Sequence, residues 1–221
     1  MTSTNRIFKF IICGTDTDIG KTLISSFFVR GLNSFYWKPI QSGIESLTDS
    51  QTVEKLTHLS KERIIKEAYV FTKPLSPHWA SEIDKKNINL DNLRIPKVKG
   101  SLIIETAGGI MVPITRNFLQ IDQIKQWNLP VILVCKSSLG TLNHTLLSIE
   151  ALKRRNIEIF GLVINGEKHL DNPKTLVEFS GIPLITEFPY IKKIDSKSFD
   201  ILLKELDIRN RLVSLLNAKI S

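Results

Sequence analysis

The sequence contains few cysteines and no long hydrophobic run. Only two of its 221 residues are cysteine, Cys13 and Cys135. Both close apolar runs of strand type, so we interpret them as buried thiols rather than as a disulfide or a metal-binding pair. No run approaches the roughly 18 apolar residues that span a bilayer, and the first ten residues hold too short an apolar stretch for a signal peptide. The sequence therefore predicts a cytoplasmic protein, in a reducing compartment, that is not inserted in a membrane.

Zinc, serine-hydrolase and nucleic-acid chemistry also have little support. The pattern G-x-S-x-G is missing, and none of the four histidines has metal-ligand spacing: His58, His78, His144 and His169. The net charge of +8 comes from lysines and arginines that are scattered along the chain without interleaved aromatic residues. We interpret this charge as solvated surface, with attraction of anionic substrates as a secondary effect, and predict no nucleic-acid partner.

Apolar runs of strand length alternate with helical stretches. The runs are too continuously apolar for half-exposed strands, and they cover residues 7–13, 34–38, 101–106, 131–135, 160–165 and 184–187. The helical stretches cover residues 22–32, 118–127, 142–155 and 173–179. This alternation is typical of βαβ units around a buried parallel sheet. The sequence predicts an α/β fold with a doubly wound, mostly parallel sheet, in a single domain over residues 1–221.

Two parts of the chain depart from the alternation. Residues 48–99 are less regular and more charged, with a helix-like piece at 49–59 and an excursion around 74–79. We expect this segment to be an insertion that lies over the sheet. Residues 198–217 carry apolar residues at helical spacing, which predicts one or two amphipathic terminal helices docked on the domain.

Residues 7–22, IFKFIICGTDTDIGKT, form the most informative segment. An apolar strand leads into a loop of glycine, threonine and aspartate, and Gly20-Lys21-Thr22 then opens an apolar helix. This is the order of a phosphate-binding P-loop, in which loop N–H groups and the helix N-terminus attract phosphate, the lysine reaches the β/γ-phosphates and the threonine hydroxyl binds Mg²⁺. Gly14 stands one residue too early for the strict G-x-x-x-x-G-K-[ST] pattern, and Thr15 takes the place of the first glycine.

A purely structural interpretation of this loop is also available. Thr17 or Asp18 could cap the helix, and Gly20 could merely turn the chain. That interpretation leaves Lys21 and the polar residues at the other strand ends unexplained, so we favour a nucleotide site.

Carboxylates for a magnesium ion are expected at strand ends near the loop. Glu105 ends an apolar strand, where it can approach Mg²⁺ held by Thr22 and by nucleotide phosphates. Magnesium takes one or two protein carboxylates, so a second acid is expected, and Asp49 is the candidate. Asp49 could instead cap the helix that follows it. Gly108 and Gly109 allow close approach of the backbone to phosphate, or they form a tight turn.

Other strand ends carry further candidates. Lys38 ends a strand before Pro39, and its cation could neutralise charge on a transferring phosphoryl group, the alternative being an exposed surface lysine. Ser42 could bind substrate or phosphate, or belong to an ordinary turn. The pair Asn165-Gly166 fits contact with an adenine edge, because an amide offers both a donor and an acceptor, and it equally fits a plain turn.

The order of the motifs along the chain resembles the ATP-dependent dethiobiotin synthetases. The motifs are GTDTDIGKT, YWKPIQSG, SPHWA, ETAGGIMVPI, SLGTLNH, VING and EFPY. The resemblance extends over residues 7–191. Its specific part is the opening motif, because the family writes G-T-D-T-x-x-G-K-T with the early glycine. Thr106 stands where the family usually has glycine.

The resemblance implies a biotin-pathway ligase with a P-loop NTPase-like fold. It would convert 7,8-diaminononanoate, CO₂ and ATP into dethiobiotin, ADP and phosphate. One amine would take up CO₂ as a carbamate, a carbamate oxygen would attack the γ-phosphate to give a carbamic-phosphoric anhydride, and the second amine would close the ureido ring. The family pattern also implies a homodimer, with residues 140–143 meeting the substrate carboxylate near its interface.

Residue roles follow from the same resemblance. Lys21 and Lys38 would be catalytic, Ser42 would contact substrate, and Thr22, Asp49 and Glu105 would hold Mg²⁺. The nucleotide contacts would be Asp18, Ile19, Gly20, Lys21, Thr22, Leu23, Asp49, Glu105, Thr106, Ala107, Gly108, Asn165, Gly166, Pro189, Tyr190 and Ile191.

Two alternatives share parts of this pattern. A MinD/ParA-type ATPase would use the same sheet as a switch between partners, but its P-loop has a second lysine at the position that Asp16 occupies here. An amidotransferase-type synthetase acting on another acid would be a nearer enzyme, but no Cys/His glutaminase unit is present.

Overall fold

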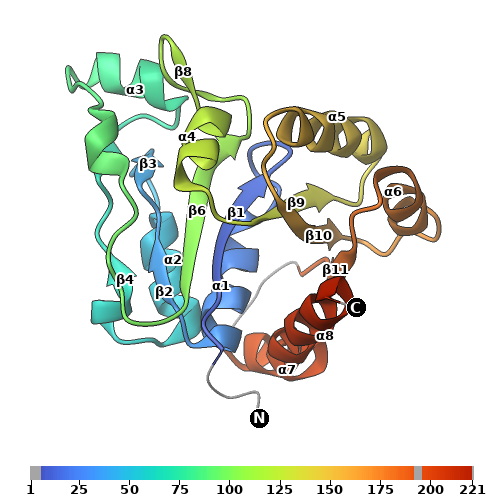
Figure 1. Ribbon diagram of the computed structural model, residues 1–221. Coiled ribbons are helices and arrows are strands. Elements are labelled where there is room, and N and C mark those ends of the chain that lie inside the picture. Colours follow the sequence, from blue (N-terminus) through green and yellow to red (C-terminus); the bar gives the residue numbers. More distant parts are fainter. Residues whose placement is uncertain (1–5, 192–195, 221) are drawn as a thin grey trace.

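The protein is built around one parallel β-sheet. The computed structural model describes residues 6–191 and 196–220. Within these residues, seven strands form the main sheet in the order β11-β10-β9-β1-β6-β2-β4, and all neighbouring pairs are parallel. Helices cover both faces of the sheet (Figure 1). The predicted α/β fold with a doubly wound parallel sheet is confirmed.

The bounds of the elements agree with most of the predicted runs. The strands of the main sheet are β1 (Lys9–Gly14), β2 (Phe35–Trp37), β4 (Ile64–Ile65), β6 (Leu102–Gly109), β9 (Val131–Lys136), β10 (Ile159–Gly166) and β11 (Leu184–Pro189). Two small sheets pair β3 (Ile40–Ser42) with β5 (Tyr69–Phe71) and β7 (Pro113–Thr115) with β8 (Phe118–Leu119). The helices are α1 (Lys21–Leu32), α2 (Asp49–Thr57), α3 (Pro77–Ile83), α4 (Gln120–Trp127), α5 (Thr141–Arg154), α6 (Asn172–Ser180), α7 (Ser196–Leu206) and α8 (Ile208–Ile220), with 3₁₀ turns at Lys61–Arg63 and Leu90–Leu93.

Alternate residues of the central strand β1 serve two separate cores. Phe10 and Ile12 pack into the layer that contains α1, α2, α7 and α8. Ile11 and Cys13 pack into the opposite layer, which contains α4, α5 and α6. This is the period of two that a strand imposes on its side chains, and burial on both faces explains why the strand is apolar throughout.

Both cysteines are buried and free, as predicted. Burial raises the pKa of the Cys13 thiol to about 12 and raises that of Cys135. The two thiols therefore stay protonated and act as small apolar side chains.

The segment between residues 48 and 99 was predicted to lie over the sheet, and this is only partly right. Phe71 and Leu93 of this segment form a small third core with Ile40 and Ile114 from outside it, and the segment also supplies β4, which extends the main sheet beyond β2. The strand β4 has only two residues and directly follows the charged residues 61–63, so it does not form an apolar run that could be recognised in the sequence.

Two boundaries differ from the predictions for local reasons. The predicted helix at 118–127 begins at Gln120, because Phe118–Leu119 pairs with β7 as strand β8. The strand that contains Glu105 continues to Gly109, so Gly108 and Gly109 belong to β6 rather than to a turn after it. The terminal helical region forms two helices, α7 and α8, which pack against α1 through Phe199 and Leu212 (Figure 1).

Among the described residues, no helix is both long enough and apolar enough to cross a bilayer.

Candidate active site

The loop between β1 and α1 has the backbone shape that its glycines predict. Gly20 precedes α1 with a φ of +89°, in the left-handed region that favours glycine. A Cβ on Gly14 would lie 2.3 Å from Cδ1 of Ile19, so a side chain at position 14 would collide with the loop. The early glycine of the motif therefore has a packing reason. It lets the buried Ile19 fold back over the end of β1.

Lys21 lies at the first turn of α1 and points into this loop. Its side chain is buried, and Nζ donates a hydrogen bond of 2.7 Å to the carbonyl oxygen of Asp16. Burial and the nearby cation of Lys38 lower the pKa of Lys21, partly opposed by the carboxylate of Glu105. The amine therefore lies within the loop, where a phosphate would be bound.

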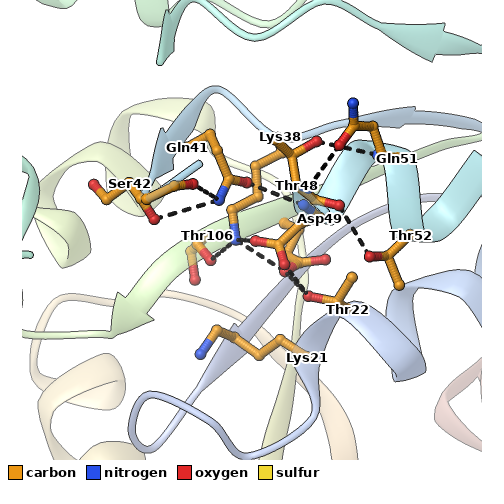
Figure 2. A network of polar contacts seen from close by, with 12 residues as sticks. Lys21, Thr22, Lys38, Gln41, Ser42, Thr48, Asp49, Gln51, Thr52 and Thr106 are labelled. Atoms are coloured by element: carbon orange, nitrogen blue, oxygen red, sulfur yellow. Dashed lines mark hydrogen bonds and ion pairs between the residues drawn. The ribbon is translucent and has the colours of Figure 1, made fainter. Parts of the chain in front are cut away.

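Thr22, Asp49 and Glu105 meet beside the loop. The hydroxyl of Thr22 is 2.8 Å from Oδ1 of Asp49 (Figure 2). It is also 2.9 Å from Oε1 of Glu105. They come from α1, α2 and β6, so the fold brings together three residues that are far apart in sequence. Two carboxylates and a hydroxyl are the hard oxygen donors that Mg²⁺ prefers, with phosphate and water completing its shell. The donors present therefore fit a magnesium ion.

Within the described ranges there is no cluster of three or more His, Cys, Asp or Glu side chains able to hold a metal by itself. A metal held by two carboxylates and a hydroxyl would thus depend on the phosphates of a nucleotide for its remaining charge neutralisation.

Lys38 is buried at the centre of the carboxylate pair. Its Nζ forms an ion pair with Asp49 Oδ2 (Figure 2). It forms a second ion pair, at 3.0 Å, with Glu105 Oε1. Burial alone would lower the pKa of Lys38, but the charges of Glu105 and Asp49 outweigh it and the pKa is raised. The interpretation of Lys38 as an exposed surface lysine is wrong.

Asp49 does not cap α2, which was the alternative to a site role. The cap is Thr48, whose hydroxyl accepts from the N–H of Gln51, while the Gln51 side chain accepts from the N–H of Thr48. This capping box sets the start of the helix and leaves the Asp49 side chain free to reach Thr22 and Lys38. Burial acts to raise the pKa of Asp49, but the ion pair with Lys38 dominates and lowers it.

Gln41 and Tyr36 contribute to the site, and the sequence analysis missed both. Gln41 is buried, its Nε2 donates to the carbonyl of Ser42 at 3.3 Å, and its Oε1 accepts from the N–H of Asp49 at 3.1 Å (Figure 2). Its Nε2 also donates to the carbonyl of Gly43 at 3.1 Å. Tyr36 donates to Glu105 Oε2 at 2.9 Å. The available signal was a tyrosine two residues before Lys38, on the same face of a strand.

The phenol of Tyr36 stays protonated at all ordinary pH values. Burial, followed by the nearby charges of Glu105 and Asp49, raises its pKa well above the usual value. Tyr36 is therefore a hydrogen-bond donor to the carboxylate.

A cavity of about 770 Å³ opens over this cluster. Ten of the predicted site residues line it: Asp18, Gly20, Lys21, Thr22, Lys38, Ser42, Asp49, Glu105, Ala107 and Gly108. The hydroxyl of Ser42 is buried, and none of the described residues offers it a hydrogen-bond partner. A substrate donor or acceptor would satisfy it.

Eight of the predicted nucleotide contacts are not among the described residues lining this cavity, and three of them, Ile19, Leu23 and Thr106, belong to the loop, α1 and β6 around it. Ile19 is buried in the core below the loop, and Leu23 packs against the same core. Thr106 is fully buried, and its carbonyl oxygen accepts a long hydrogen bond of 3.5 Å from Lys38. Its side chain therefore does not crowd the surface of the cavity.

A second cavity of about 480 Å³ lies at the ends of β10 and β11. Gly166, Pro189 and Tyr190 line it, together with Glu187 and Phe188. Asn165 lies beside it and donates a hydrogen bond of 2.9 Å from Nδ2 to the carbonyl of Ile19. Ile191 packs against the core instead. The structure thus places the two predicted adenine-side segments next to each other, and Asn165 joins them to the phosphate loop.

Comparisons with known proteins show the family to which this chain belongs. The family model described as an AAA domain matches residues 9–198. The ATP-dependent dethiobiotin synthetase BioD of Brucella anthropi is 46% identical over 186 residues, which cover 84% of this chain and 88% of that protein. The protein of the same name from Rhodopseudomonas palustris (strain BisB18) is 41% identical over 89% of this chain and 94% of its own length. The chain belongs to the ATP-dependent dethiobiotin synthetase family. The resemblance of its motifs to this family is confirmed.

Solved structures outside the dethiobiotin synthetase family share the fold. The septum site-determining protein MinD of Pyrococcus horikoshii, complexed with Mg-ADP, is 13% identical with a TM-score of 0.56, over 93% of each chain. The pNOB8 ParA bound to nonspecific DNA is 10% identical with a TM-score of 0.55, over 96% of this chain and 99% of that one. At this identity the likeness concerns the P-loop NTPase fold alone, which agrees with the predicted fold class.

Proposed function

We propose that this protein is an ATP-dependent dethiobiotin synthetase that acts in biotin biosynthesis. It forms the ureido ring of dethiobiotin from 7,8-diaminononanoate and CO₂, and converts ATP to ADP and phosphate. The observation that carries the proposal is the convergence of Lys38, Thr22, Asp49 and Glu105 beside a phosphate loop, in a chain that belongs to this family.

The residues of the phosphate loop bind and neutralise phosphate. Lys21 and the N–H groups at the start of α1 face the loop interior, and Gly20 gives the backbone its left-handed turn. A bound magnesium ion would neutralise charge on phosphate oxygens. Thr22, Asp49 and Glu105 would hold it, because the Thr22 hydroxyl lies within hydrogen-bond distance of both carboxylates.

Lys38 would act on the reacting groups. A carbamate is formed when one substrate amine takes up CO₂ and loses a proton, and a carbamate oxygen then takes the γ-phosphoryl group to give a carbamic-phosphoric anhydride. Attack by the second amine on the carbonyl carbon closes the ring and releases phosphate. Each step develops negative charge on oxygen, which the cations of the buried side chains of Lys38 and Lys21 would stabilise.

The diamine would lie on the side of the cavity away from the loop. There the wall contains Ser42 and the apolar side chains of Leu47, Pro74 and Leu75. An unpartnered hydroxyl next to an apolar wall fits a molecule that carries amino groups on an aliphatic chain. The adenine base would occupy the second cavity, at Gly166, Pro189 and Tyr190, next to Asn165.

We further propose that the enzyme works as a homodimer in the cytoplasm. Leu139 and Leu147 are more than half exposed at the start and along the outer face of α5, next to residues 140–143. Exposed leucines at this place fit a subunit interface that closes the site near the substrate carboxylate.

The decisive test is identification of the product by mass spectrometry. The purified protein is incubated with ATP, Mg²⁺, bicarbonate and 7,8-diaminononanoate, and we expect dethiobiotin together with one phosphate per product. Omission of the diamine, the bicarbonate or Mg²⁺ should abolish phosphate release. Rapid ATP turnover without the diamine would contradict the proposal and would favour a MinD/ParA-type ATPase.

A further inference from the structure

Tyr36 and Lys38 both contact Glu105, Tyr36 from within β2 and Lys38 from the residue that follows this strand. Tyr36 lies in β2 and packs in the core that contains α1, whereas the intervening Trp37 packs in the opposite core. Lys38 follows on the same side as Tyr36, because side chains alternate along a strand. The sequence YWK therefore presents a hydroxyl and an ammonium group to the same carboxylate of β6.

The two contacts divide the oxygens of Glu105. The hydroxyl of Tyr36 donates to Oε2 at 2.9 Å, whereas Lys38 and Thr22 lie 3.0 and 2.9 Å from Oε1. Tyr36 and Glu105 are both fully buried, so water does not compete for Oε2. One oxygen is thus held inside the protein, and the other faces Thr22.

A carboxylate without such a contact can rotate and present either oxygen. The hydrogen bond from Tyr36 fixes the plane of the Glu105 carboxylate, which fixes the direction from which Oε1 approaches a metal ion beside Thr22. Hydrogen bonds of this kind to metal ligands typically change metal affinity by about 10-fold to 100-fold when they are removed.

We propose that Tyr36 is a positioning residue for magnesium, acting through Glu105 and keeping Oε1 as the single oxygen that this residue offers to the ion. The inference rests on the proposed function, in which Glu105 is a magnesium ligand. Tyr36 does not touch substrate or nucleotide; it sets the orientation of a group that does.

The test uses Tyr36→Phe, which removes only the hydroxyl. Binding of ADP is measured by isothermal titration calorimetry over a series of Mg²⁺ concentrations, so that no turnover is needed. We expect the half-saturating Mg²⁺ concentration to rise about 10-fold or more, with the affinity for ADP in the absence of Mg²⁺ unchanged.

Tyr69→Phe is the matched control. Its hydroxyl also makes hydrogen bonds, to Asn89 and Asn92, but it lies in the small sheet of β3 and β5. This variant should keep the half-saturating Mg²⁺ concentration of the wild type, although it also loses the hydrogen bonds of a tyrosine hydroxyl.

The outcomes separate this inference from the proposed function. Wild-type protein whose ADP affinity does not respond to Mg²⁺ would overturn the metal site and the inference with it. A Mg²⁺ response that is equal in wild type and Tyr36→Phe would overturn the role of Tyr36 alone, even if Tyr36→Phe has a lower melting temperature.

A second comparison applies if Tyr36→Phe does not fold. In Tyr36→Phe, the buried carboxylate of Glu105 keeps its charge but loses the hydrogen bond from Tyr36, and Glu105→Gln removes this charge. The double variant Tyr36→Phe/Glu105→Gln is therefore compared with the single variant Glu105→Gln. We expect equal half-saturating Mg²⁺ concentrations, because Tyr36 acts through the carboxylate. A further loss in the double variant would contradict the inference.

Discussion

The side-chain amide of Asn165 donates a hydrogen bond to the carbonyl oxygen of Ile19, which ties the end of β10 to the phosphate loop. Gly20 makes this contact possible, because a Cβ at position 20 would lie 2.2 Å from Nδ2 of Asn165. The end of β10 and the loop before α1 are therefore held together at the carboxyl edge of the sheet.

Replacement of this amide should weaken nucleotide binding. In Asn165→Asp, a carboxylate faces the carbonyl of Ile19 and repels it, so we expect the dissociation constant for ADP to rise about 10-fold, equivalent to the loss of one to two kcal/mol of hydrogen bonding. Fluorescence or calorimetric titration with ADP measures this. Asn210→Ala, on the exposed surface of α8, is the control. Unchanged affinity in Asn165→Asp would contradict the role of this contact.

Removal of either site lysine should reduce turnover. We expect Lys21→Met and Lys38→Met to lower kcat by about two to three orders of magnitude, the range observed when one group that stabilises transition-state charge is lost. Lys153→Met is the matched control, because Lys153 bonds to the carbonyl of Ser180 between α5 and α6, away from the site. Phosphate release with all substrates present gives the rates. Near-normal turnover would exclude the lysine concerned from the mechanism.

Lys38→Met should also lower stability, unlike the control. It leaves Glu105 buried without its cation, which typically costs about 3 to 5 kcal/mol. Chemical denaturation of the two variants measures the difference. Equal free energies of unfolding would show that the carboxylate pair does not depend on Lys38.

The stability of the protein should depend on the ionisation of Asp49. Its pKa is lowered in the folded state, because the ion pair with Lys38 outweighs burial. A lowered pKa means that the contribution of Asp49 to folding is fully present above its ordinary value of 3.8 and is lost as pH falls below it. Urea denaturation of wild type and Asp49→Asn between pH 6 and pH 3 should show a difference in unfolding free energy that shrinks toward low pH. A difference independent of pH would contradict this assignment.

Replacement of Gln41 should weaken the binding of both the diamine substrate and Mg²⁺. It holds the carbonyls of Ser42 and Gly43 with one end and the N–H of Asp49 with the other. We expect Gln41→Met, which keeps the length of the side chain but removes its polar groups, to raise KM for the diamine and the half-saturating Mg²⁺ concentration, and to cost about 1 to 3 kcal/mol of stability. Steady-state kinetics and chemical denaturation test this. A loss of stability with both constants unchanged would assign Gln41 a structural role only.

The parts of the site that follow one another along the chain were predictable. The strand, the loop and the helix that begins at Lys21 are contiguous, so residue order alone reveals a phosphate site. The site role of Glu105 was predictable because a carboxylate at the end of a buried, apolar strand is costly unless it is paired with a cation or a metal ion.

The parts that depend on tertiary pairing were not predictable in the same way. From the sequence alone, Tyr36 is interpreted as an aromatic residue of the core. Its hydroxyl reaches Glu105 only because β2 pairs with β6 in the register that sets Tyr36 opposite Ile103. From the sequence alone, Gln41 is interpreted as a surface residue of a short loop. Its role depends on the position of α2, whose first residue, Asp49, donates a hydrogen bond to it. The two residues of β4 carry no pattern at all, because their burial comes from neighbours that the sequence does not identify.

The ion pairs of Lys38 bear on whether the protein can fold before it binds nucleotide or metal. Lys38 forms ion pairs with both Asp49 and Glu105, so the fully buried carboxylate of Glu105 needs no external cation when the sheet assembles. Folding can therefore be completed on a newly made chain before it meets nucleotide or metal, and the supply of either should not limit how much folded protein accumulates.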